Sequence, residues 1–179
     1  MPGEGQSSVS STLAYDIRPL DPNDDFGQFQ VEHAELSLLK DFLDGHARNL
    51  HELNVSKTYV AAIGRRVIAF LSLCCSQVNF DLPPTELPKI PYRAFPAIKI
   101  GQLAVDANFQ KQKVGSTLIS LAIALAKEHV QPRIGCRLLI VDSHKDAVQF
   151  YRGKGFIVVA SGKEKKFPVM FLDLGKLES

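Results

Sequence analysis

Apolar residues recur at helical spacing in some segments of the chain and follow strand-like patterns in others. In residues 31–50 the apolar side chains lie three or four positions apart, which predicts an amphipathic helix. Residues 114–130 are apolar on nearly every side and polar mainly at the two ends, so we expect this helix to be buried against a sheet. A shorter amphipathic helix is expected over residues 145–154, where Gly155 ends it.

Segments rich in β-branched, aromatic and other apolar residues predict strands between these helices. They are residues 14–20, 58–63, 67–78, 97–105, 136–141, 156–160 and 169–174. The second and third are separated only by Gly64, Arg65 and Arg66, which indicates a hairpin, and the length of the third favours a β-bulge. Residues 80–96 contain five prolines and therefore predict a loop.

The order of these elements predicts a mixed α/β sheet with helices on both faces. Strand 97–105, helix 114–130 and strand 136–141 form a β-α-β unit, for which a right-handed crossover is the rule. We expect residues 13–179 to form a single domain. Residues 1–12 are rich in Gly and Ser and poor in large apolar groups, so we expect a mobile tail there.

Composition excludes several functional classes. An apolar fraction of 45% is typical of a globular protein, and a net charge of +2 is too small to indicate nucleic-acid binding by itself. The chain has neither the roughly 20 apolar residues of a membrane span nor a secretory signal, so we expect a cytoplasmic protein with no membrane contact. The three cysteines match neither a disulfide framework nor a zinc site, and no metal is expected.

The junction between strand 97–105 and helix 114–130 carries the first candidate chemistry. The first turn of a helix presents unpaired backbone N–H groups and the positive end of the macrodipole, which favour an anion such as a diphosphate. Lys111 and Lys113 add positive charge, Gly115 has no side chain, and Ser116 and Thr117 can donate hydroxyl hydrogens. The alternative is an ordinary strand-to-helix turn with solvated lysines.

A tyrosine near the end of the third predicted helix is the second feature with candidate chemistry. Tyr151 follows Phe150 and precedes a glycine turn into the next strand. A phenol in this position can donate a proton to a leaving thiolate. The alternative is a tyrosine that belongs to the core.

Together these two segments resemble the signature of the GNAT family of N-acetyltransferases. IGQLAVDANFQKQKVG, residues 100–115, is similar to the family's strand followed by Gln/Arg-x-x-Gly-x-Gly/Ala, and AVQFYRGKGF, residues 147–156, is similar to its Ala-x-x-Phe-Tyr-x-x-x-Gly-Phe. The resemblance implies a mostly antiparallel sheet with a central parallel strand pair that splays apart to admit acetyl-CoA. It also implies that a primary amine attacks the thioester directly.

The resemblance assigns roles to individual residues. Tyr151 would protonate the leaving thiolate, and the backbone N–H of Val105 would polarise the thioester carbonyl. The residues implied to bind the coenzyme are Leu103, Ala104, Val105, Gln110, Lys111, Gln112, Lys113, Val114, Gly115, Ser116, Thr117 and His144. Lys113 stands where the family has the first glycine of its signature, and a positive φ there would cost a lysine about 1 kcal/mol.

The resemblance extends to a subgroup of bacterial toxins from toxin–antitoxin pairs, which acetylate the amino group of aminoacyl-tRNA. It is carried by LLKDFLDGHARNLHELNVSKTYV, residues 38–60, and by the proline-rich loop before strand 97–105. Three functions stay open: acetylation of another primary amine, acetylation of aminoacyl-tRNA by a toxin with an antitoxin partner, and acyl-CoA binding without catalysis. A homodimer is a further expectation.

The acceptor amine and the general base are left open. Glu32, Glu35 and Asp106 are candidates for the base by position alone. Basic residues that could contact tRNA phosphates are Lys57, Arg65, Arg66, Lys89, Arg93, Lys163, Lys165 and Lys166.

Overall fold

The computed structural model describes residues 13–80, 85, 87–159 and 167–177. Its strands are β1 (Asp16–Pro19), β2 (Lys57–Ile63), β3 (Arg66–Asn79), β4 (Ala94–Val105), β5 (Leu138–Asp142), β6 (Ile157–Val158) and β7 (Val169–Asp173). Its α-helices are α1 (Ser37–Gly45), α2 (Ala47–Glu52), α3 (Val114–Ala124) and α4 (Val148–Arg152). Shorter turns are η1 (Ala34–Leu36), η2 (Ala107–Phe109), η3 (Leu125–Val130), η4 (Lys145–Ala147) and η6 (Leu174–Lys176). The tail expected over residues 1–12 lies outside the described residues.

The strands form one seven-stranded sheet in the order β1-β2-β3-β4-β5-β7-β6. Strands β4 and β5 are parallel, and every other pairing among the described strands is antiparallel. This confirms the predicted mixed, mostly antiparallel sheet with a central parallel pair. The predicted hairpin is β2 and β3, and the register shift between Ala61 and Ala62 confirms the bulge.

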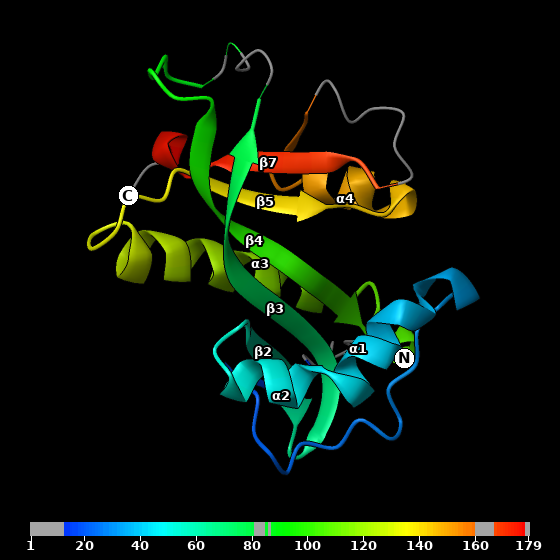
Figure 1. The fold of residues 1–179 in the computed structure, drawn as a ribbon. Coiled ribbons are helices and arrows are strands. Elements are labelled where there is room, and N and C mark those ends of the chain that lie inside the picture. Colours follow the sequence, from blue (N-terminus) through cyan, green and yellow to red (C-terminus); the bar gives the residue numbers. More distant parts are fainter. Residues whose placement is uncertain (1–12, 81–84, 86, 160–166, 178–179) are drawn as a thin grey trace, which may run out of the picture.

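The central parallel pair separates along its length. β4 pairs with β3 as far as Val105, but its pairing with β5 covers only Ala97–Ile100. The register between β3 and β4 shifts beside Gly101, where β4 turns away from β5 (Figure 1). The predicted splay is therefore present, and residues 101–105 form the open side of β4.

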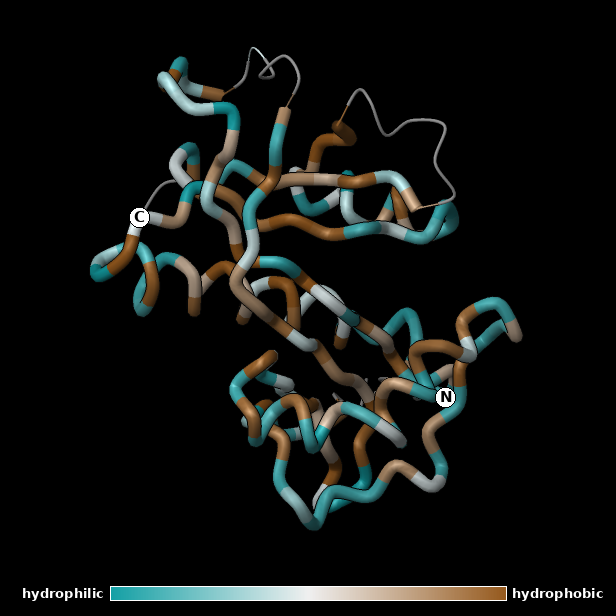
Figure 2. The backbone as a smooth tube through the Cα atoms, in the orientation of Figure 1, coloured by the Kyte–Doolittle hydropathy of each residue, from teal (hydrophilic) through white to brown (hydrophobic). Residues whose placement is uncertain are grey.

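Helices cover both faces of the sheet, as expected. On one face α1 and α2 bury Leu43 and Ala47 in a cluster that contains Phe70 of β3. On the other face α3 and α4 bury Leu118 and Tyr151 against the central strands. Figure 1 shows α1 and α2 in front of the sheet and α3 and α4 behind it, and Figure 2 shows that the apolar residues concentrate in the strands between them.

Several predicted boundaries were wrong. Residues 31–50 are not one helix: α1 ends at Gly45 and α2 begins at Ala47, because His46 leaves helical geometry at φ −127° and ψ −31°. The break follows a glycine, which is a poor helix former. The helix over residues 114–130 is α-helical only to Ala124, and its last six residues widen into a π-helix. β4 begins at Ala94 rather than at residue 97.

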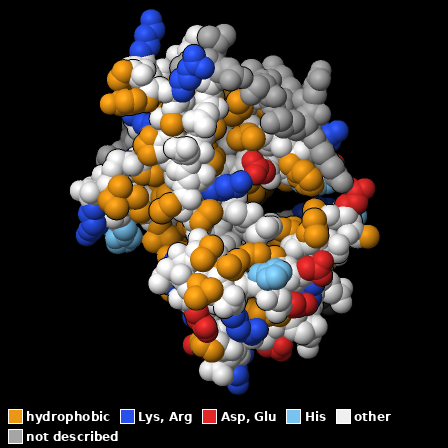
Figure 3. Space-filling view, in the orientation of Figure 1, with side chains coloured by type: hydrophobic (Ala, Val, Ile, Leu, Met, Phe, Trp, Pro, Cys, Tyr) orange, Lys and Arg blue, Asp and Glu red, His pale blue; other side chains and the backbone are white. Residues whose placement is uncertain are grey.

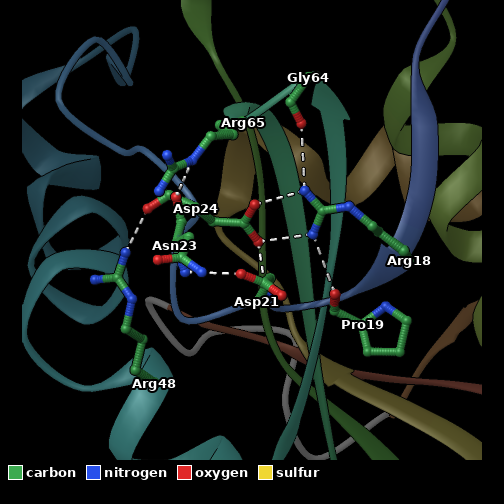
Figure 4. Close-up of polar contacts among 8 residues, drawn as sticks. All are labelled: Arg18, Pro19, Asp21, Asn23, Asp24, Arg48, Gly64 and Arg65. Carbon is green, nitrogen blue, oxygen red and sulfur yellow. Dashed lines mark hydrogen bonds and ion pairs between the residues drawn. The ribbon is translucent and has the colours of Figure 1, made fainter.

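Charged residues hold the segment after β1 against the β2–β3 hairpin (Figure 4). Arg18 donates two hydrogen bonds to the buried carboxylate of Asp24, at 2.9 and 2.6 Å. Arg48 of α2 donates to the Asp24 carbonyl at 2.5 Å, and Arg65 donates to the Asn23 carbonyl at 2.9 Å. Among the described residues, no helix is both long enough and apolar enough to cross a membrane.

Candidate active site

A groove of about 990 Å³ opens where β4 and β5 part. Its floor is the open side of β4, one wall comes from η1 and α1, and the other comes from the loop after β5 and from α4. Figure 3 shows the hollow between the two halves of the molecule, with acidic side chains beside it. The groove therefore opens onto residues 101–105 of β4, which do not pair with β5.

The backbone of β4 presents hydrogen-bonding groups to this groove. The Asp106 N–H donates to the Ile68 carbonyl of β3 at 2.8 Å, so the N–H groups toward β3 belong to alternate residues. By this alternation the N–H groups of Leu103 and Val105 point away from β3. Both residues lie beyond the last pair with β5, so their N–H groups face the groove. An extended ligand that carries amides can pair with this edge.

The loop before α3 is shaped to receive an anion. Lys111 and Lys113 both adopt left-handed backbone conformations, with φ 62° and 64°. Such alternation of backbone conformation turns successive N–H groups toward one point. Thr117 N–H donates to the Lys113 carbonyl at 3.0 Å as the first bond of α3, so the N–H groups before it are available to a ligand. Lys113 therefore has the positive φ whose cost to a lysine was considered from the sequence.

Gly115 has a packing role that the sequence did not indicate. A β-carbon on Gly115 would lie 3.3 Å from Val105 Cγ2 and 3.5 Å from the Phe150 ring. The absent side chain therefore lets the start of α3 approach β4 and α4. A larger residue at this position would therefore disturb packing as well as the approach of a phosphate.

Tyr151 is buried beside the groove that it lines. Its ring makes edge-to-face contacts with Phe150 and Phe156, at centroid distances of 5.2 and 5.3 Å. Burial raises the pKa of the phenol well above its ordinary value, so the hydroxyl keeps its hydrogen at neutral pH. Tyr151 belongs to the core and also lines the groove, and its role as a proton donor stays a prediction.

Most of the predicted site residues come together in this groove. Those that line it are Leu103, Ala104, Val105, Gln110, Lys111, Lys113, Val114, Gly115, Ser116, His144 and Tyr151. The other two, Gln112 and Thr117, line a second groove of about 960 Å³ between β1 and the same loop. The Thr117 hydroxyl donates to the Lys113 carbonyl at 3.2 Å and accepts from Tyr15 at 3.3 Å.

Charge is distributed unequally along the main groove. Lys111 and Lys113 lie at the helix end, whereas Glu32 and Glu35 lie at the wall made by η1 and the residues before it. Lys99 and Asp142 also line the groove, and their side chains pair at 2.5 Å where the strands begin to part. One end of the groove therefore suits an anion and the other suits a cation.

Sequence reasoning missed several residues that line the groove, and most of these lie outside the two motifs. Lys99 and Asp142 could have been found from the parallel register of their strands, whereas Phe109 and Phe167 carry no local signal. Asp106 was wrongly placed among the possible bases: it is fully buried and accepts from the N–H and side chain of Asn108 at 2.8 and 3.0 Å. These bonds cap the turn after β4.

The cysteine that lines the groove is not set up for covalent catalysis. Burial raises the pKa of the Cys74 thiol, so the reactive thiolate is disfavoured. Among the described residues, no group of three or more His, Cys, Asp or Glu side chains could hold a metal ion. The groove offers backbone N–H groups, lysines and a protonated phenol, which suit transfer of a group from a phosphate-bearing thioester.

Solved structures with the same architecture agree with this geometry. AtaT complexed with acetyl-methionyl-tRNAfMet is 25% identical, with a TM-score of 0.75 over 90% of this chain and 96% of that one. AtaTR bound with AcCoA is also 25% identical, with a TM-score of 0.73 over 90% and 94% of the two chains. A Tyr-to-Phe mutant of KacT has the same fold, with a TM-score of 0.80 at 20% identity over 91% and 96%.

The fold and groove define the class: a transferase that takes an acyl group from a coenzyme A thioester. The family model of the acetyltransferase (GNAT) domain matches residues 54–158. The chain therefore belongs to the GNAT family, and it is an acyl-CoA-dependent N-acetyltransferase with acetyl-CoA as cosubstrate. The resemblance of the two sequence motifs is confirmed.

Proposed function

We propose that this chain transfers the acetyl group of acetyl-CoA to the amino group of an aminoacyl-tRNA, as the toxin of a toxin–antitoxin pair. The observation that carries the proposal is the groove between β4 and β5, whose anion-binding end and backbone edge suit coenzyme A and whose other end suits an ammonium group. The likeness to AtaT, over nearly the whole of both chains, supports tRNA as the acceptor. Because aminoacyl-tRNA is made in the cytoplasm, we place the reaction there.

In this proposal the coenzyme lies along the open side of β4. Its diphosphate is held by the N–H groups of residues 110–117 and by Lys111 and Lys113, and its pantetheine amides pair with Leu103 and Val105. The resemblance implies a coenzyme contact for His144, which lies on the wall formed by the loop after β5. All these residues belong to one domain, residues 13–179.

The acetyl group then moves without a covalent enzyme intermediate. The amine, after losing a proton to water, attacks the carbonyl carbon, and the Val105 N–H stabilises the negative charge that develops on the carbonyl oxygen. The carbon–sulfur bond breaks, the departing thiolate takes a proton from Tyr151, and the nitrogen gives up its second proton to water. Water returns a proton to the phenolate, so the enzyme ends unchanged.

Phosphates of the tRNA need cations outside the groove. Lys89 and Arg93 are exposed in the loop before β4 and are available for this contact. Arg65 and Lys57 already donate to backbone carbonyls, at 2.9 and 3.0 Å, which makes them weaker candidates. Lys163, Lys165 and Lys166 lie outside the described residues.

The proposal is tested with radiolabelled acetyl-CoA and a panel of acceptors. We expect label in the aminoacyl fraction of charged tRNA and none in the same tRNA after deacylation. Label only in small amines or in protein lysines would instead support the first of the three open functions. Binding of acetyl-CoA with no release of free thiol in any mixture would support a binding module without catalysis.

The toxin role has its own experiment. Induced expression should stop growth, and expression of an antitoxin encoded beside it should restore growth. Unhindered growth during verified expression would contradict the toxin role and leave the transferase activity to be judged by the acceptor panel. Sedimentation of the purified protein would show whether it forms the expected homodimer.

A further inference from the structure

His144 and Glu35 meet across the acceptor end of the groove. The His144 Nε2 atom lies 3.4 Å from Glu35 Oε2, although the two residues belong to different layers of the fold. Glu35 is in η1, on the side of α1, and His144 precedes η4 after β5. The two walls of the groove therefore touch through this pair.

The backbone fixes the hydrogen on the imidazole nitrogen that faces Glu35. His144 Nδ1 accepts from the Asp146 N–H at 3.4 Å, as the cap of η4. With Nδ1 as acceptor, the ring carries its hydrogen on Nε2. Nε2 therefore donates toward Glu35. The Asp146 carboxylate lies 3.4 Å from Nδ1 and so cannot take the place of Glu35 at Nε2.

Glu35 needs such a partner because its side chain is otherwise free to move. The Glu35 side chain is 72% exposed, whereas the His144 side chain is 18% exposed. A contact from a half-buried ring limits the rotamers of an exposed glutamate, which lowers the entropy lost when a ligand binds it. Asp142, the other acidic residue on the opposite wall, is already paired with Lys99.

We propose that Glu35, positioned by His144, binds the ammonium group of the acceptor and selects acceptors with a free, positively charged amine. A carboxylate oxygen accepts a charge-assisted hydrogen bond from an ammonium group, which is stronger than a bond between neutral groups. The acceptor therefore waits as a cation beside Glu35 and loses a proton to water before attack. Once acetylated, the nitrogen is a neutral amide, and its attraction to Glu35 is lost.

This inference rests on the proposed function and makes it more specific. Among aminoacyl-tRNAs, those with a free α-ammonium group bind, and those with a formylated or acetylated nitrogen do not. The same selection also applies to a small amine, so the inference can be tested with whichever acceptor the wild-type enzyme uses best. Failure of tRNA acetylation and failure of the Glu35 role are thus separate results.

The test compares steady-state constants for acceptor and coenzyme in matched variants. Glu35→Gln keeps the shape of the side chain and removes its charge; we expect KM for the acceptor to rise about tenfold while kcat and KM for acetyl-CoA stay within about twofold. Asp41→Asn removes the same charge from α1, outside the groove, and should leave all three constants within about twofold.

His144 variants separate positioning from coenzyme contact. His144→Ala should raise the acceptor KM as Glu35→Gln does, and His144→Gln, whose amide nitrogen can donate in place of Nε2, should restore it. Since His144 acts through Glu35, the double variant Glu35→Gln with His144→Ala should be no worse than the more affected single variant, rather than about a hundredfold impaired.

Three results would overturn the inference. A raised KM for acetyl-CoA in His144→Ala would place the ring at the coenzyme instead. Additive increases of the acceptor KM in the double variant would show that the two residues act independently. An equal increase in Asp41→Asn would show that Glu35 acts only through the general negative charge of this surface.

Discussion

Substitutions of Lys113 allow the backbone strain at the N-terminus of α3 to be measured. Its φ of 64° and ψ of 4° lie in the left-handed region, which costs a residue with a β-carbon roughly 1–2 kcal/mol. Glycine adopts this conformation freely but loses more entropy on folding, so the net gain from Lys113→Gly is about 1 kcal/mol. For a chain of this size that gain is a rise in Tm of about 3 °C.

The charge of Lys113 is a separate quantity, and a second variant isolates it. Lys113→Gln removes the charge and keeps the β-carbon, so its stability should stay near that of the wild type. Both variants should bind coenzyme A about threefold more weakly at low salt, because each loses one exposed cation beside the diphosphate. In 1 M salt their affinities should approach that of the wild type.

Urea unfolding and calorimetric titration with acetyl-CoA measure the two effects independently. Equal unfolding midpoints for Lys113→Gly and Lys113→Gln would refute the strain argument. Wild-type affinity in both variants would show that the lysine side chain points away from the diphosphate. If only Lys113→Gly lost affinity, the left-handed lysine would be serving to hold the loop open.

Three further predictions concern Tyr151, Arg18 and His51. Tyr151→Phe keeps the buried ring, so Tm and acetyl-CoA affinity should persist while kcat falls about a hundredfold; wild-type kcat would remove Tyr151 from the mechanism. Arg18→Ala should lower the free energy of unfolding by about 2–3 kcal/mol in urea titrations, since it leaves the carboxylate of Asp24 buried and unpaired; a loss below about 0.5 kcal/mol would contradict this. Burial, and after it the nearby charge of Lys57, lowers the pKa of His51. Below about pH 6.5 the unfolded chain therefore binds more protons than the folded chain, and the free energy of unfolding decreases as the pH is lowered. His51→Asn should flatten that dependence in unfolding measured from pH 7.5 to 5.5, and an unchanged slope would count against it.

The parts of the fold fixed by local pattern could be predicted from sequence. Helix 114–130 and the strands on either side of it were found because their apolar runs are long and interrupted by polar loops. The break at His46 was missed because the apolar spacing continues across it, with Leu43 and Ala47 both buried. The π-helix after Ala124 was missed for a similar reason, since its residues keep a helical composition.

The candidate site divides in the same way. The loop Gln110–Gly115 and Tyr151 lie within contiguous motifs, and a linear pattern can show such motifs. The meeting of Glu35 with His144 joins residues more than a hundred positions apart, and only the packing of η1 against the other half of the sheet brings them together. A single sequence carries no signal for that contact.

The limited pairing of β4 with β5 has a mechanical consequence. Backbone pairing between the two halves of the sheet covers residues 96–100 and 137–141, so the two halves meet at a short seam. A change of a few degrees in the angle between the two halves shifts residues far from the seam by a larger distance than residues at the seam. The coenzyme and the amine must meet at that distant end. Substitutions at seam positions that are buried and lie outside the groove, such as Ile98 and Leu139, would therefore alter the alignment of the two substrates without touching either of them.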